Sequence, residues 1–193
     1  MDTPAYCLEE ALEQAGAMTS RVHIALRVPA TPLRTFQAFT DEIALWWQPS
    51  TLFRLTPQGD GRLAFEPGVD GRLLTRLANG EEFEIGRISI WEPGRRLIFT
   101  WRPASFTPEQ STEVEVRFEG VGDETRISIE HRAWDTIPQK HVARHGFPEH
   151  VTLQHVAGWW RASLIMLENR LVTARTASEQ PGSPPVRRGA GRE

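Results

Sequence analysis

The chain has 193 residues, 39% of them hydrophobic and 24% charged, which is the ordinary range for one globular domain. A formal net charge of -3 gives no broad attraction to phosphate backbones or anionic lipid, so nucleic acid and membranes are excluded as expected partners. The single cysteine, Cys7, allows no intramolecular disulfide, and no segment approaches the ~18 apolar residues of a membrane span. Glu9 and Glu10 interrupt the place where a signal peptide would be apolar, so we expect a cytoplasmic protein.

The two ends of the chain differ from its middle. Residues 1–20 form a weakly amphipathic lead with no recognisable module. Residues 173–193 contain Gln-Pro-Gly-Ser-Pro-Pro and a final stretch rich in arginine and glycine, which buries too little apolar surface to offset chain entropy. We therefore predict a domain over residues 21–172, followed by a disordered tail.

The domain begins with a strand and two short helices. Apolar residues alternate with polar ones from Val22 to Val28, the period of a half-buried strand. Pro32 suits the first turn of a helix, and the apolar residues after it recur at helical spacing: Leu33, Phe36 and Phe39. Asp41 is a candidate N-cap for a second helix that ends before Pro49 and carries Ile43, Leu45 and Trp46.

Six further segments have strand-like sequences separated by turn residues. They cover residues 62–66, 71–77, 82–91, 96–101, 112–118 and 125–132. The connections, such as Pro67-Gly68 and Asn79-Gly80, are too short for parallel crossovers. With the first strand, these segments predict a seven-stranded antiparallel meander.

Two of these segments show which face of the sheet is buried. In segment 112–118 every second residue is expected to be buried, namely residues 112, 114, 116 and 118. The glutamates and the arginine between them are expected to face solvent. In the next segment the apolar side chains stand at odd-numbered positions, which include Ile129 and place His131 inward. In the fourth strand, Phe83 and Ile88 differ in parity, which predicts a bulge at Gly86-Arg87.

The last element is a long amphipathic helix from Pro148 to Leu171. Its apolar residues lie on one stripe at spacings of three and four: Leu153, Ala157, Trp160, Leu164, Leu167 and Leu171. At 1.5 Å per residue this helix is roughly 35 Å long, enough to cross the whole sheet. The predicted fold class is α+β: a helix-grip fold with a curved seven-stranded antiparallel sheet, two short helices and a long C-terminal helix.

The order of elements and several local phrases resemble the SRPBCC superfamily of START-like helix-grip proteins, and within it the Aha-type branch. This branch is named for the C-terminal domain of the activator of the heat-shock protein ninety ATPase. The phrases are Phe39-Thr40-Asp41, Trp46-Trp47, Phe65-Glu66-Pro67, Gly71-Arg72, Gly86-Arg87-Ile88, Trp91-Glu92-Pro93, residues 96–101, Thr112-Glu113-Val114, Thr125-Arg126-Ile127, Glu130-His131-Arg132 and Gly158-Trp159. Together they span about residues 20–172.

The resemblance implies a cavity for an apolar small molecule between sheet and helix. One departure is that Ser163 stands where the branch usually has a leucine four residues after Gly-Trp, whereas Leu164 follows Trp160 by four. Either Trp159 or Trp160 can therefore be the tryptophan that faces the cavity. The predicted ligand-binding residues are Trp47, Phe65, Phe83, Arg87, Trp101, Phe118, Ile129, His131, Trp160 and Leu164.

Polar candidates within this set are few. His131 is the candidate for a general base or a hydrogen-bonding group, and a satisfied core histidine is the alternative. Glu66 and Arg87 are candidates for orienting a ligand, with a surface position as the alternative. His141 and His145 have the spacing of a metal pair, but Gly146 and Pro148 follow and no third ligand is recognisable, so we expect no metal and no cofactor.

Three functions remain open. The first is the binding of a hydrophobic small molecule without catalysis, which a fully packed interior would contradict. The second is a protein interaction of the chaperone-ATPase-activator kind. The third is a cyclase- or hydrolase-type enzyme that uses His131. The oligomeric state, monomer or homodimer, is also open.

Overall fold

The computed structural model describes residues 20–50, 52–59 and 61–179, so Cys7, almost all of the predicted lead and residues 180–193 of the predicted tail lie outside the described residues. Seven strands form one sheet in the order β1-β7-β6-β5-β4-β3-β2, and every neighbouring pair is antiparallel. The strands are β1 Val22–Val28, β2 Arg62–Phe65, β3 Arg72–Arg76, β4 Glu82–Glu92, β5 Arg96–Trp101, β6 Thr112–Val121 and β7 Glu124–Arg132. The predicted meander is confirmed, and β1 closes it by pairing with β7.

The irregularity expected in β4 is present, but as two register shifts. Towards β3, Ile85 is the extra residue, because Leu73 lies opposite Gly86 and Leu74 opposite Glu84. Towards β5, Ser89 is the extra residue. At Gly86 a Cβ atom would lie 1.7 Å from the carbonyl oxygen of Thr100, so only glycine permits this approach of the strands. The two shifts let β4 bury both Ile85 and Ile88.

Two short helices follow β1. Helix α2 covers Pro32–Thr40, and the Thr31 side chain caps it by accepting from the Arg34 amide at 3.3 Å. Helix α3 covers Ile43–Trp46; it begins after Glu42 and has no side-chain cap, so Asp41 does not have the predicted role. Leu33 and Leu45 are exposed, unlike the other members of the predicted stripes.

The long helix α4 covers Glu149–Glu179 and begins directly after Pro148, as predicted. It continues past residue 172, where we expected the tail to start. Leu171 is its last buried residue up to residue 177, where the description of burial ends, and the added turns include alanine, arginine and threonine. Alanine and arginine favour helix without needing a packing partner, which explains why the apolar stripe underestimated the length.

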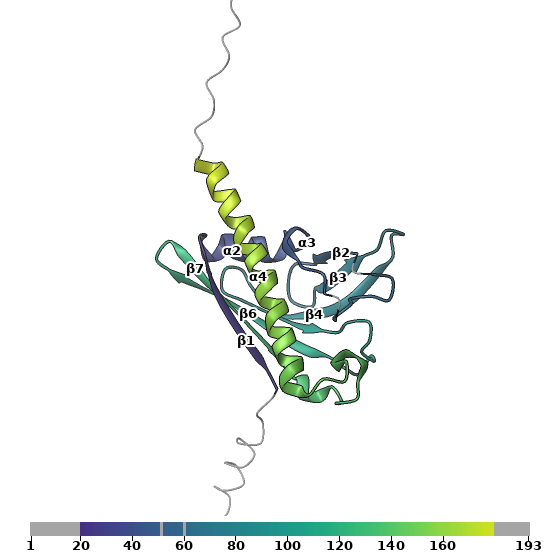
Figure 1. Ribbon diagram of the computed structural model, residues 1–193. Helices are drawn as coiled ribbons and strands as arrows, with labels where there is room; N and C mark the ends of the chain where they lie inside the picture. The colour runs from purple at the N-terminus through teal and green to yellow at the C-terminus, as the bar shows by residue number, and fades with distance from the viewer. Residues whose placement is uncertain (1–19, 51, 60, 180–193) are drawn as a thin grey trace, which may run out of the picture.

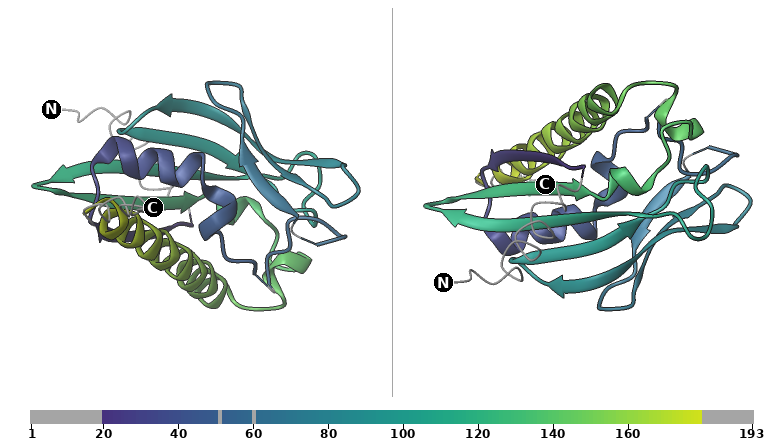
Figure 2. Two further views of the ribbon diagram at one scale, coloured as in Figure 1. Left: turned by 90° about the horizontal axis from the view of Figure 1, so that it is seen from above. Right: turned by 90° about the horizontal axis from the view of Figure 1, so that it is seen from below.

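Helix α4 lies across the sheet and packs on β1, while α2 packs on β6 and β7 (Figures 1 and 2). Two short 3-10 helices, η1 Trp134–Thr136 and η2 Val142–Arg144, join β7 to α4 at the end of the sheet opposite α2 (Figure 1). The loops at this end are therefore close to the start of α4.

The inner face of the sheet is buried as the alternation predicted. The inward residues of β6 and β7 are at most 4% exposed: Thr112, Val114, Val116, Phe118, Thr125, Ile127, Ile129 and His131. Two outward residues differ from the prediction, because Ser128 is only 5% exposed and Glu115 only 4%. Its carboxylate is covered by Arg96 at 2.8 Å, Arg117 at 2.7 Å and Arg132 at 3.2 Å. Burial alone raises the pKa of Glu115, but the arginines outweigh it and hold the pKa below its ordinary value.

Candidate functional site

Four residues of the predicted set, Trp47, Trp101, Trp160 and His131, meet with Trp134 and Trp159 in what we call the tryptophan cluster. Trp47 lies at its centre, with ring centroids 5.5 Å from Trp101, 4.9 Å from Trp159 and 5.7 Å from Trp160. His131 contacts Trp134 at 4.9 Å. Separations of this size are typical of packed aromatic pairs. The cluster joins α3, β5, β7 and α4 into one interior.

A chain of hydrogen bonds crosses this cluster. The indole nitrogen of Trp160 is 3.1 Å from Nδ1 of His131, and because indole only donates, Nδ1 must accept. The proton of the neutral ring is then on Nε2, which is 2.7 Å from the Thr112 hydroxyl. That hydroxyl in turn donates to the Trp101 carbonyl oxygen at 3.3 Å. Both ring nitrogens of His131 therefore have partners within the protein.

This environment determines the chemistry of His131. The residue is fully buried, and burial lowers the pKa of its imidazole from 6.5 to about 3. The ring is neutral at physiological pH, and neither nitrogen presents an unused lone pair or proton to a substrate. The arrangement fits a core histidine that positions Trp160 and Thr112.

The other predicted ligand-binding residues divide between core and surface. Phe118, Ile129 and Leu164 are at most 4% exposed, and Phe65 packs on Phe99 at 5.3 Å. Phe83 is partly buried against the same core. The structure therefore brings the apolar members of the predicted set into the interior.

The two polar candidates of the sheet lie apart from the cluster. Arg87 is exposed and pairs with Glu84 at 2.9 Å. Glu66 accepts from Nε of Arg72 at 2.7 Å, and this hydrogen bond lowers the pKa of its carboxyl. Both side chains are engaged in surface ion pairs, which is the alternative interpretation of each.

The structure distinguishes Trp159 from Trp160. Trp160 is fully buried against His131. Trp159 is half-buried on the side of the loop after α3, where its indole nitrogen donates to the Gln48 carbonyl oxygen at 2.9 Å. Trp160 is therefore the inward-facing residue, and Trp159 connects the helix to that loop.

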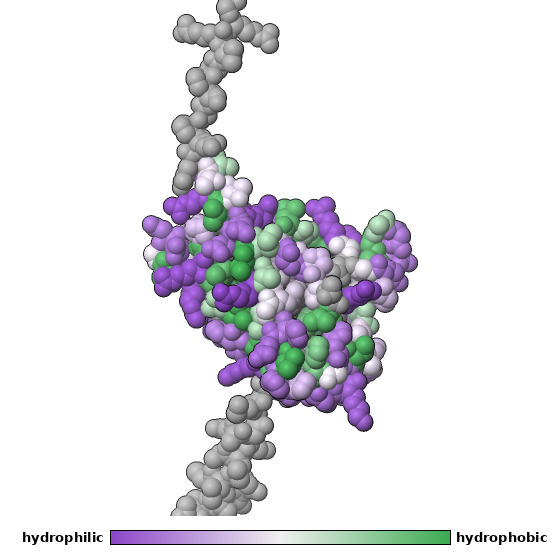
Figure 3. Space-filling view, viewed as in Figure 1, coloured by the Kyte–Doolittle hydropathy of each residue, from purple (hydrophilic) through white to green (hydrophobic). Residues whose placement is uncertain are grey.

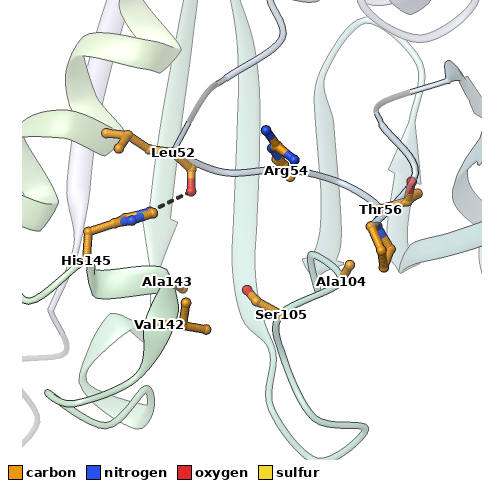
Figure 4. Close-up of a pocket in the computed structure, with 9 residues that line it drawn as sticks. Leu52, Arg54, Thr56, Ala104, Ser105, Val142, Ala143 and His145 are labelled. Atoms are coloured by element: carbon orange, nitrogen blue, oxygen red, sulfur yellow. Dashed lines mark hydrogen bonds between the residues drawn. The ribbon is translucent and has the colours of Figure 1, made fainter.

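An open cleft of about 460 Å³ lies beside the cluster, and we call it the loop cleft (Figure 4). It is lined by three loops: the one between α3 and β2, the one between β5 and β6, and the segment around η2. The lining residues are Leu52, Arg54, Thr56, Pro57, Ala104, Ser105, Val142, Ala143 and His145. None of them belongs to the predicted set of ligand-binding residues, since loops carry no periodic signal.

His145 joins two walls of the loop cleft. It has a φ of 50°, in the left-handed region, and its Nε2 is 2.7 Å from the Leu52 carbonyl oxygen (Figure 4). Nδ1 of His141 accepts from the Ala143 amide at 3.1 Å, so the two histidines have separate partners. Over residues 20–50, 52–59 and 61–179, no group of three or more histidine, cysteine or acidic residues is placed to hold a metal.

Phenylalanines separate the cleft from the cluster. Phe53 lies 6.0 Å from Trp134 and 5.9 Å from Trp159, and it also contacts His145 at 6.5 Å. Phe106 contacts Trp134 at 6.5 Å. The indole nitrogen of Trp134 is buried and has no hydrogen-bond partner among the described residues. The loop cleft thus adjoins an aromatic interior.

On the side shown in Figure 3, hydrophobic residues are scattered among hydrophilic ones. A smaller cleft of about 270 Å³ lies between the end of β1, α2 and the C-terminal turns of α4. Among the described residues, no helix combines the length and the apolar sequence that crossing a membrane requires.

Comparison with solved structures supports the fold. Protein MLL2253 from Mesorhizobium loti has a TM-score of 0.54 at 17% identity, and covers 80% of this chain and 97% of its own. An Hsp90 activator from Plasmodium falciparum has a TM-score of 0.54 at 21% identity, and the match covers 79% of this chain and 96% of the activator. The Aha1 dimer from Colwellia psychrerythraea has a TM-score of 0.51 at 20% identity, and the match covers 78% of this chain and 95% of the Aha1 chain.

The sequence itself carries a family signature. No curated protein matches the chain. The model of the family described as "Activator of Hsp90 ATPase homolog 1-like protein" matches residues 29–171, from the end of β1 to the last buried turn of α4. The chain therefore belongs to this Aha-type family of the SRPBCC superfamily.

Proposed function

We propose that the protein binds a small, largely apolar molecule in the loop cleft. The observation that carries the proposal is the cleft itself, an open space of about 460 Å³ with leucine, valine, alanine and proline among its lining residues. This volume is within the range of about 300–1,000 Å³ that is typical of small-molecule sites. Phe53 and Phe106, behind the lining, supply an aromatic floor.

The proposed place differs from the one expected between sheet and helix. Trp101 and Trp160 are at most 1% exposed, and Phe118 is 4% exposed, so a water molecule can touch almost none of their surface. A ligand among these residues would first have to displace side chains from a packed interior, which is costly. The loop cleft needs no such displacement.

Fluorescence titration with N-phenyl-1-naphthylamine tests this proposal. Its apolar rings fit the chemistry of the lining, and its emission rises in apolar surroundings. We expect saturable binding by the wild type and at least about tenfold weaker binding by Ser105→Trp, because an indole at this exposed lining position fills the cleft. Ala25→Trp is the control, since it adds an exposed indole on β1 away from the cleft. Equal binding by both variants would place the probe elsewhere and overturn the proposal.

A second candidate is contact with a chaperone ATPase, which the family description favours. The test is the ATPase rate of an Hsp90-type chaperone with increasing amounts of the full chain. Stimulation that saturates supports the activity. An unchanged rate together with no co-elution of the two proteins contradicts it.

A further inference from the structure

We propose that the loop cleft selects molecules that carry an anionic group, such as a carboxylate or sulfonate, beside their apolar body. This inference rests on the proposed binding function and names the chemical class of its ligand. It is based on two arginines, one lining the cleft and one behind it, and on the absence of acidic side chains from the lining among the described residues.

Arg54 provides the accessible charge. Its side chain is exposed and lines the cleft, and it forms no ion pair with the part of the chain that the structure describes (Figure 4). Other arginines differ: Arg72 is paired with Glu66 and Arg96 with Glu115. A guanidinium that has no carboxylate partner within the protein can bind one from a ligand, and such charge-assisted bonds are the stronger kind.

Arg144 provides a second, buried charge. It is 3% exposed and follows the lining residue Ala143 in the chain. Its guanidinium donates to the carbonyl oxygens of Ile137, at 2.9 Å, and Trp134, and to Gln139 Oε1 at 3.4 Å. Within residues 20–50, 52–59 and 61–179 it has no carboxylate partner.

The consequence is a positive potential at the wall formed by η2. A buried guanidinium usually has a carboxylate partner, and carbonyl dipoles stabilise the charge without neutralising it. In surroundings of low polarity its field is weakly screened and extends over neighbouring groups. His145, next in the chain, lines the same wall and adds a polar ring. An anionic group near Arg54 and this wall would meet attraction from both sides.

Two fluorescent probes separate the two proposals. N-Phenyl-1-naphthylamine and 8-anilino-1-naphthalenesulfonate share the anilinonaphthalene body, and only the second carries a charge. We expect the wild type to bind the sulfonate at least about tenfold more tightly than the neutral probe at low salt, the factor of one charge-assisted hydrogen bond. Added salt should reduce this preference.

The variant Arg54→Gln tests whether the guanidinium of Arg54 causes the preference for the sulfonate. The exposed position makes a folding defect unexpected, and the variant should lose most of the preference, measured as the ratio of the affinity for the sulfonate to the affinity for the neutral probe. Arg54→Lys should retain part of the preference. Arg27→Gln, an equal loss of charge at an exposed position of β1, is the control and should leave both probes unchanged.

The outcomes are distinguishable. If neither probe binds, both proposals fail. If the neutral probe binds in the cleft but the sulfonate binds no more tightly, or if Arg54→Gln keeps the preference, then anion selection alone is overturned.

Discussion

The tryptophan cluster and the loop cleft lie next to each other, but they are built in different ways. The cluster takes its side chains mainly from regular elements, and His131, Thr112 and Trp160 use their polar groups on one another. The cleft takes its side chains from loops around η2 and after α3 and β5, and Arg54 keeps an exposed charge. In the cluster, the polar groups of His131, Thr112 and Trp160 are paired within the protein, although the buried indole nitrogen of Trp134 has no partner among the described residues. In the cleft, the charge of Arg54 remains accessible to a ligand.

This difference shows how an inward polar residue should be judged. A histidine surrounded by aromatic rings on a concave sheet looks like a catalytic group from its position alone. Its role depends on whether its nitrogens already have partners, and those of His131 do. Residues on loops beside a packed interior are better placed for binding, because their side chains remain accessible.

The largest effect should come from the two adjacent tryptophans of α4. Trp160→Ala removes a fully buried indole and leaves His131 without its donor, so we expect a loss of about 3–5 kcal/mol in the free energy of unfolding. Trp159→Ala should cost clearly less, because the half-buried Trp159 ring packs beside a loop that can relax. Urea denaturation of both variants measures the difference. Equal losses would mean that the half-buried ring of Trp159 is packed as tightly as the buried ring of Trp160.

A smaller effect is expected at His131. His131→Leu fills similar space but leaves the indole nitrogen of Trp160 buried without an acceptor, which should cost about 1–3 kcal/mol. His131→Gln keeps one acceptor and one donor and should cost less. Denaturation measures stability, and titration with N-phenyl-1-naphthylamine measures the cleft. Normal stability of His131→Leu combined with lost binding would contradict the division between the two regions.

Much of the fold follows from local patterns. The alternation in β6 and β7 and the glycine and proline turns predicted the strands to within a few residues, and Pro148 marked the start of α4. These features depend on neighbouring residues only, so a single sequence shows them. The burial of Glu115 could not be predicted in this way, because it requires arginines from β5 and β7 to lie beside it in register.

The candidate site was harder to predict for the same reason. The pattern indicated correctly that His131 points inward, but its partners Thr112 and Trp160 are 19 and 29 residues away. The cleft forms where three loops meet, and the hydrophobic residues of these loops follow no periodic pattern in the sequence. The spacing of His141 and His145 is that of a metal-binding pair, whereas in the structure His145 forms a hydrogen bond with the carbonyl oxygen of Leu52, 93 residues away.

The most gradual predicted effect is a pH dependence of the stability that comes from His131 in the cluster. The pKa of His131 is about 3 in the folded protein, against an ordinary value of 6.5. Above pH 6.5 the ring is neutral in both states and its contribution to stability is complete. As the pH falls below 6.5, the unfolded chain binds a proton that the folded protein does not, so stability falls by about 1.4 kcal/mol per pH unit towards pH 3.

The measurement is the free energy of unfolding between pH 6.5 and 5. Below this window, carboxylates with lowered pKa values such as Glu115 lose their own contribution as they become protonated, which adds to the decline. His131→Gln should remove the part of the slope that comes from this residue, whereas His150→Gln, at an exposed position of α4, should keep it. If His131→Gln retains the wild-type slope, the ring must accept a proton in the folded protein. The hydrogen-bond chain through Trp160 and Thr112 would then not hold it neutral, and His131 would again be a candidate for proton transfer.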